Sequence, residues 1–98
     1  MINQLLPVGS VITLKGATKR LLIIGITVER QENGEIYDYI AVPYPEGYID
    51  GDTMFLFFHK DIEKVNYIGF VDAESQTFRI EYARRLKKEG IIIADIET

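Results

Sequence analysis

The sequence contains no cysteine and only one histidine, His59. The lack of cysteine excludes a disulfide scaffold, a thiolate nucleophile and thiolate metal ligands. A single histidine cannot supply a multi-histidine metal site, and no serine lies in a nucleophile-elbow motif. A histidine–carboxylate pair between His59 and Asp61 is one interpretation, but a role for His59 as a cap or surface residue after a strand is simpler. We therefore expect no catalytic residues, no metal site and no cofactor.

Long apolar runs are also absent. The longest, residues 21–26, has the length of a strand, whereas a helix that crosses a bilayer needs about 20 apolar residues. The first residues lack the basic region and long apolar stretch of a signal peptide. We expect a cytoplasmic protein without membrane insertion.

The remaining composition is that of one folded domain. The chain has 98 residues, of which 47% are hydrophobic. This length is close to the common domain size, and the apolar fraction argues against disorder. We expect a single domain over residues 1–98 with one core.

Short runs of β-branched and aromatic residues, separated by turn signals, predict strands. Pro43 should end the third run, because proline cannot donate to a ladder. The fourth run is apolar on both faces, so it should be central or covered. The runs are residues 11–15, 20–28, 36–42, 53–58 and 65–71, with residues 91–96 as a sixth candidate.

The second run carries a glycine, Gly25, that predicts a bulge or sharp bend. Apart from that bend, Leu22, Ile24, Ile26 and Val28 alternate and should share one face. Short runs and a strong bend predict mostly antiparallel strands that form either a strongly bent sheet or a small barrel.

One helix is predicted near the C-terminal end, over residues 73–89. Phe78, Tyr82 and Leu86 recur every four residues and define an apolar stripe. Asp72 is suited to cap the N-terminus and Gly90 the C-terminus. Five or six strands followed by one amphipathic helix indicate an α+β fold.

The most informative segment is residues 38–52, which holds two of the three prolines and three of the six tyrosines. Tyrosine is favoured at interfaces, where it buries a large ring and keeps a polar tip. The prolines on both sides of Tyr44 stiffen the chain, so less conformational entropy is lost on binding. The rings either close one end of a barrel or contact a protein partner.

Charge is unevenly distributed. Residues 29–52 carry seven acidic residues and one basic residue, a net charge of −6, whereas residues 79–89 carry +3. Two solvated faces are the simplest interpretation; ends that meet different partners are the alternative. The acidic region repels phosphate, so we expect no nucleic-acid partner. Glu46, Asp50 and Asp52 lack the spacing of a calcium loop.

Three segments, residues 6–16, 37–47 and 57–70, carry a resemblance that spans roughly residues 5–72. The chain resembles a family of small Gram-positive bacterial proteins long labelled as a domain of unknown function. That family is similar to the accessory proteins encoded in type VII secretion loci beside LXG-type toxins.

The resemblance implies a non-enzymatic chaperone or adaptor that binds an LXG-type toxin or a secretion component. An immunity-type toxin inhibitor is the alternative, and a nucleic-acid-binding small barrel is a weaker one. A homodimer through exposed strand edges is also open. The candidate protein-interaction residues are Tyr37, Asp38, Tyr39, Pro43, Tyr44, Pro45, Glu46, Gly47 and Tyr48.

Overall fold

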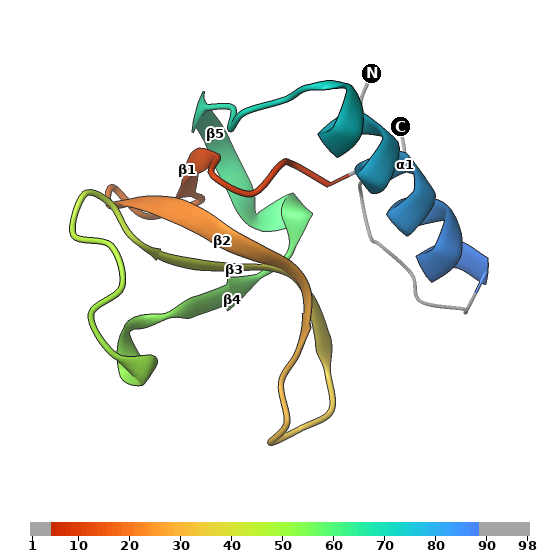
Figure 1. Ribbon diagram of the computed structural model, residues 1–98. Helices are drawn as coiled ribbons and strands as arrows, with labels where there is room; N and C mark the ends of the chain where they lie inside the picture. The colour runs from red at the N-terminus through yellow and green to blue at the C-terminus, as the bar shows by residue number, and fades with distance from the viewer. Residues whose placement is uncertain (1–4, 89–98) are drawn as a thin grey trace.

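The computed structural model describes residues 5–88, so the candidate strand at residues 91–96 lies outside the described part. Within residues 5–88, five strands, two short 3-10 helices and one α-helix follow one another (Figure 1). They are β1 (Val11–Leu14), β2 (Arg20–Glu29), β3 (Ile36–Pro43), η1 (Gly51–Thr53), β4 (Phe55–Phe57), η2 (His59–Asp61), β5 (Ile62–Tyr67) and α1 (Ala73–Lys88).

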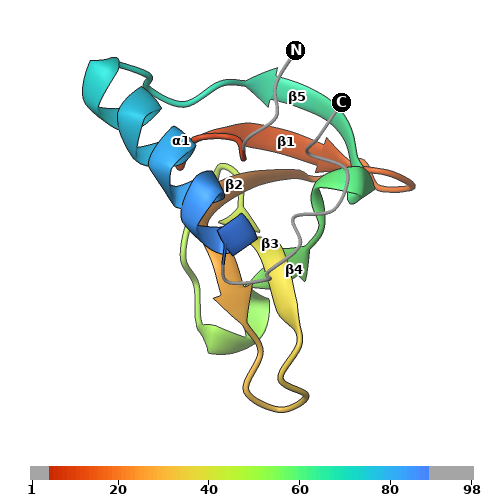
Figure 2. The ribbon, with the colours of Figure 1, turned by 90° about the vertical axis from the view of Figure 1, so that its right-hand side faces the viewer.

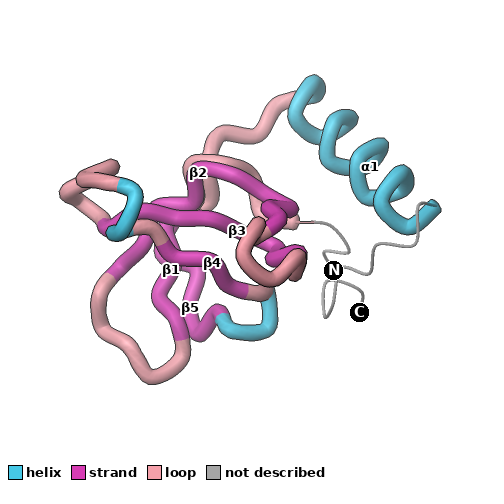
Figure 3. Tube along the Cα trace, turned by 90° about the horizontal axis from the view of Figure 1, so that it is seen from below, coloured by secondary structure: helices cyan, strands magenta, loops and turns pink. Residues whose placement is uncertain are grey.

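The strands form one antiparallel sheet in the order β4-β3-β2-β1-β5. The sheet is strongly bent and does not close into a barrel, so the bent sheet is the correct one of the two expected forms. Figures 1 and 3 show α1 beside the strands. The predicted α+β fold with one C-terminal helix is confirmed.

The bend in β2 lies where Gly25 predicted it. The pairing register with β3 shifts between Ile23 and Gly25, which leaves Ile24 exposed. A Cβ atom at Gly25 would lie 2.8 Å from Cγ2 of Ile40. The expectation that Leu22, Ile24, Ile26 and Val28 share one face was wrong, because the bulge divides them. Before the bulge Leu21 and Ile23 are buried and Ile24 is exposed, whereas after it Ile26 packs against the core.

β4 is an edge strand rather than a central one, so that expectation was wrong. It has three residues and pairs with β3 alone. Phe57 reaches the core, but 41% of the Phe55 side chain is exposed. An apolar run does not imply cover on both faces when the strand is short and bounded by turns.

α1 begins after Asp72, as predicted. The Asp72 carboxylate accepts a hydrogen bond from the Ser75 N–H at 2.9 Å, which satisfies one of the free donors of the first turn. The buried face of the helix, however, includes Arg79 at 8% exposure, while Phe78 is exposed. The apolar spacing therefore predicted the helix and misplaced its inner face.

The core lies between the bent strands and the N-terminal segment at residues 5–10. Tyr39 from β3 lies in it without exposed surface, packed among aliphatic side chains and Phe57, whose ring centroid is 5.5 Å away. The buried cluster contains Leu5, Leu6, Ile12, Leu21, Ile23, Tyr39, Ala41 and Phe57.

Candidate functional site

The structure divides the nine candidate residues into three that are buried, two that are half-buried and four that are exposed. Tyr39 belongs to the buried group. Its hydroxyl accepts a hydrogen bond from the Leu6 N–H at 2.9 Å and lies 2.7 Å from Nδ1 of His59. Burial, with a smaller contribution from the Asp38 carboxylate, raises the pKa of Tyr39 well above its usual value. The ring therefore holds the core together and is not presented to a partner.

Asp38 and Pro43 are buried as well. The Asp38 carboxylate accepts a hydrogen bond from the His59 backbone N–H at 2.8 Å, and so connects β3 to η2. In the same turn, the Asp61 carboxylate accepts from the Phe58 N–H at 3.0 Å. The single histidine thus lies in a structural corner between β4 and β5.

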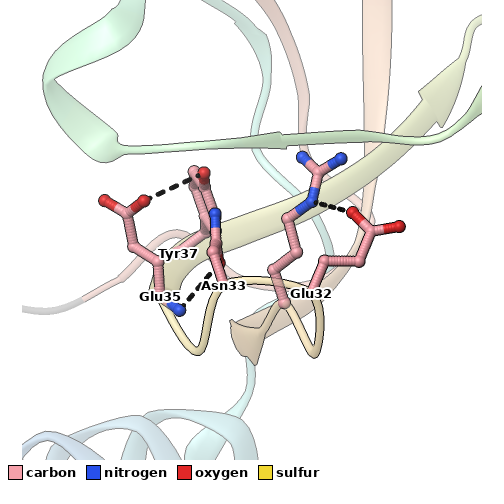
Figure 4. Close-up of polar contacts among 5 residues, drawn as sticks. Glu32, Asn33, Glu35 and Tyr37 are labelled. Atoms are coloured by element: carbon pink, nitrogen blue, oxygen red, sulfur yellow. Dashed lines mark hydrogen bonds and ion pairs between the residues drawn. The ribbon is translucent and has the colours of Figure 1, made fainter.

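Tyr37 is half-buried near the turn between β2 and β3. Its ring stacks on Phe58 with centroids 4.9 Å apart, and its hydroxyl donates to Glu35 at 3.2 Å. Figure 4 shows this contact beside the Asn33 side chain, which accepts from the Glu35 N–H at 2.8 Å. The ring therefore has partners within the chain.

The remaining candidates belong to the connection from β3 to β4, which is held against the β1–β2 turn. The Tyr44 N–H donates to the Arg20 carbonyl at 3.0 Å, and the Arg20 guanidinium lies 5.4 Å from the centre of the Tyr44 ring. The Gly47 N–H donates to the Pro43 carbonyl at 2.7 Å, with Gly47 at a φ of +80°. These contacts fix residues 43–47 as a tight turn.

Glu46 adds an ion pair to this turn. Its carboxylate lies 2.8 Å from Nζ of Lys19, and the hydrogen bond from Lys19 lowers the pKa of Glu46. Both side chains are about half exposed. The pair therefore orients the turn more than it stabilises the fold.

Beyond the turn, the connection presents apolar side chains to solvent. Tyr48 is 67% exposed, and Ile49 and Phe55 are exposed near it in the sequence. Asp50 caps η1, since its carboxylate accepts from the Asp52 N–H at 3.0 Å and from the Thr53 hydroxyl. We define the β3–β4 surface as the exposed side chains of this connection together with the first residue of β4: Tyr44, Pro45, Glu46, Tyr48, Ile49, Asp50, Asp52 and Phe55.

The β3–β4 surface contains Tyr44, Pro45, Glu46 and Tyr48 of the original candidates, and Gly47 lies within its turn. Sequence reasoning missed Ile49 and Phe55. The run from Thr53 to Phe58 looked like a central strand, and a short edge strand has the same apolar composition.

Two further properties concern the described chain as a whole. Residues 5–88 contain no group of three histidine, aspartate or glutamate residues placed to hold a metal ion. In the same range, no helix is both long and apolar enough to cross a membrane.

The fold and this surface define the class: a small α+β domain whose bent sheet presents an acidic, tyrosine-containing connection at one edge. The chain belongs to a family described as "Domain of unknown function (DUF4176)", whose family model matches residues 5–78. No curated protein and no solved structure matches the chain. The expected membership of an unknown-function family is thereby confirmed.

Proposed function

We propose that this protein is a non-catalytic cytoplasmic chaperone or adaptor that binds an LXG-type toxin, or a secretion component, of a type VII secretion system. The proposal is supported by the sequence resemblance to accessory proteins of toxin loci. Membership of the unknown-function family is compatible with that resemblance. The observation that carries it is the β3–β4 surface, where exposed aromatic side chains extend from an anchored turn.

An anchored turn suits recognition for a physical reason. A flexible loop loses conformational entropy when it binds a partner, which weakens binding. A loop that is already held in place loses less. Contacts from Arg20 and Lys19 hold Tyr44 and Glu46 before any partner arrives. Tyr48 and Ile49 remain exposed, and buried aromatic rings often contribute most of the energy at an interface.

The charge of the surface indicates the chemistry of the partner. Asp50 and Asp52 are exposed and close to Tyr48 in the sequence. The nearby basic residues, Lys19 in the β1–β2 turn and Arg20 at the start of β2, already contact Glu46 and Tyr44. Complementary charge steers association and suppresses wrong partners. The expected partner segment is therefore apolar with basic residues on its border.

The decisive experiment is affinity purification of the tagged chain from cells that express the native locus. A toxin or secretion component should be retained by the wild-type chain and lost with Tyr48→Asp. Phe78→Asp is the matched control, since Phe78 on α1 is 55% exposed and lies outside the surface. If nothing from the locus is retained, and deletion of the gene leaves toxin level and export unchanged, the proposal is wrong.

An immunity-type inhibitor is the second candidate, favoured by the exposed acidic residues that could imitate an anionic substrate of a toxin. The two functions differ in whether they protect a cell from the toxin. An inhibitor protects a cell in which the toxin domain alone is produced, and a chaperone does not. Survival of such cells would replace the chaperone proposal with the inhibitor.

A further inference from the structure

A second exposed surface lies at the opposite end of the strand order, on β5 and the segment that follows it. Figures 1 and 2 show this segment along the outer edge of the molecule. Among its side chains, Phe70 is 77% exposed, the largest exposed fraction among the exposed large hydrophobic residues. We call this set the β5 patch: Val8, Val65, Tyr67, Ile68, Phe70 and Val71.

The β5 patch is held in place by a buried glycine between two exposed apolar residues. The Gly69 N–H donates to the Ser10 hydroxyl at 3.0 Å, and that hydroxyl donates to the Pro7 carbonyl at 2.8 Å. A Cβ atom at Gly69 would lie 2.6 Å from the Val8 carbonyl oxygen. Only glycine permits this approach, so Ile68 and Phe70 extend from a fixed point.

That fixed point is joined to the core sheet. The Gly9 N–H donates to the Ile23 carbonyl at 2.8 Å, and the Ile23 N–H donates to the Ser10 carbonyl at 2.9 Å. The segment that contacts Gly69 is therefore hydrogen-bonded to β2. Exposed apolar side chains on such a rigid base lose little entropy when they are covered.

Charge decides which partner suits this patch. Residues 65–71 contain no charged residue, although 27% of the chain is charged. In a two-fold dimer each residue near the axis meets its own copy. The acidic β3–β4 surface and the basic helix α1 would both repel their own copies, and the β5 patch would not.

We propose that the protein forms a two-fold symmetric homodimer in which the β5 patches of two copies pack against each other. A large aromatic residue can bury about 150–250 Å², and on that scale the exposed parts of the six side chains amount to roughly 600 Å² in one copy. A contact that covered all of this area in both copies would bury at most about 1,200 Å², the lower end of the range for specific interfaces. The proposal concerns a different surface from that of the proposed function and does not depend on it.

The contact is made by side chains rather than by a continuous ladder between two β5 strands. The pairing of β1 with β5 has register shifts after Val11 and after Thr13, which make β5 irregular. Bulges of this kind disturb the edge to which another strand would add.

Sedimentation equilibrium of the full chain from about 1 to about 500 µM tests the dimer by mass action. The wild-type chain should pass from monomer to dimer. Phe70→Asp should raise the dissociation constant at least a hundredfold, because it places like charges at the symmetric contact. Ile68→Asp should do the same, and Tyr48→Asp on the β3–β4 surface should leave the dimer unchanged.

A salt titration distinguishes this dimer from a head-to-tail contact between the acidic region and α1. Raising NaCl from about 0.05 to about 0.5 M should not weaken an apolar contact, whereas screening would dissociate an electrostatic one. A monomer at every concentration, a dimer that Phe70→Asp and Ile68→Asp leave intact, or dissociation by salt would each overturn the proposal.

Discussion

The Tyr39 hydroxyl accepts a hydrogen bond from the Leu6 backbone N–H across 33 positions of the chain, at 2.9 Å. The same oxygen lies 2.7 Å from Nδ1 of His59. One buried hydroxyl therefore joins the N-terminal segment, β3 and η2. Its contacts explain why the most conspicuous tyrosine motif in the sequence is partly structural.

Tyr39→Phe removes that hydroxyl and keeps the ring. The buried Leu6 N–H would lose its partner, so we expect a loss of about 1–3 kcal/mol in the free energy of unfolding. Urea denaturation measures the change. Tyr37→Phe is the control, since its hydroxyl contacts the exposed Glu35. An equal loss in both variants would show that the Tyr39 hydroxyl has no special role.

The two ends of β4 should differ strongly in their tolerance of truncation. Phe57 is buried in the core and Phe55 is 41% exposed. Phe57→Ala should cost about 3–5 kcal/mol through the cavity that it leaves. Phe55→Ala should cost clearly less, because part of its ring is already in water. Denaturant titrations of both variants test the order, and a larger loss for Phe55→Ala would contradict the observed edge position.

Gly69→Ala should be destabilising because its Cβ would meet backbone atoms of Val8 and Gly9 at 2.6 and 2.9 Å. The main chain must move, at a cost of about 1–3 kcal/mol, the range for overpacking. Gly51→Ala is the matched control, since its Cβ would have no atom within 4 Å. Thermal unfolding compares the two, and equal melting temperatures would be the contrary result.

Arg79 should anchor α1 to the rest of the chain. Its Nη1 donates to the Leu5 carbonyl at 3.0 Å, and its Nη2 donates to Gln76. Arg79→Ala would leave that buried carbonyl unpaired, at a cost of about 1–3 kcal/mol. In the Arg79→Ala variant, hydrogen exchange should show that the opening of α1 is accelerated more than the opening of the strands.

Arg84→Ala is the control for that measurement. Arg84 pairs with Glu81 on the exposed side of the same helix, and such pairs contribute little. Equal exchange rates in the two variants would mean that Arg79 does not hold the helix.

Local chemistry made several elements predictable. Asp72 caps a helix through its own side chain and the backbone N–H three residues ahead, a spacing that is visible in the sequence. The bulge at Gly25 and the end of β3 at Pro43 follow from backbone properties of single residues. These features depend on neighbours within a few positions.

The direction in which a side chain points and its burial were less predictable, because both depend on residues far apart in the chain. Arg79 is buried since the carbonyl that it binds belongs to Leu5, 74 positions earlier. Tyr39 faces the core and Tyr48 faces solvent, although both lie in one tyrosine-rich segment. Composition cannot distinguish a ring that fills the core from one presented to a partner.

The sequence by itself determined the class of fold, the family, and the alternation of acidic and basic regions, since each depends on residue identities and short spacings. Only the tertiary structure decided that β4 and β5 are the edges, and which apolar residues of these strands and their flanking segments are exposed. The reason is physical: strand order and side-chain exposure arise from long-range pairing, which brings Gly69 against Ser10 and leaves Phe70 in water.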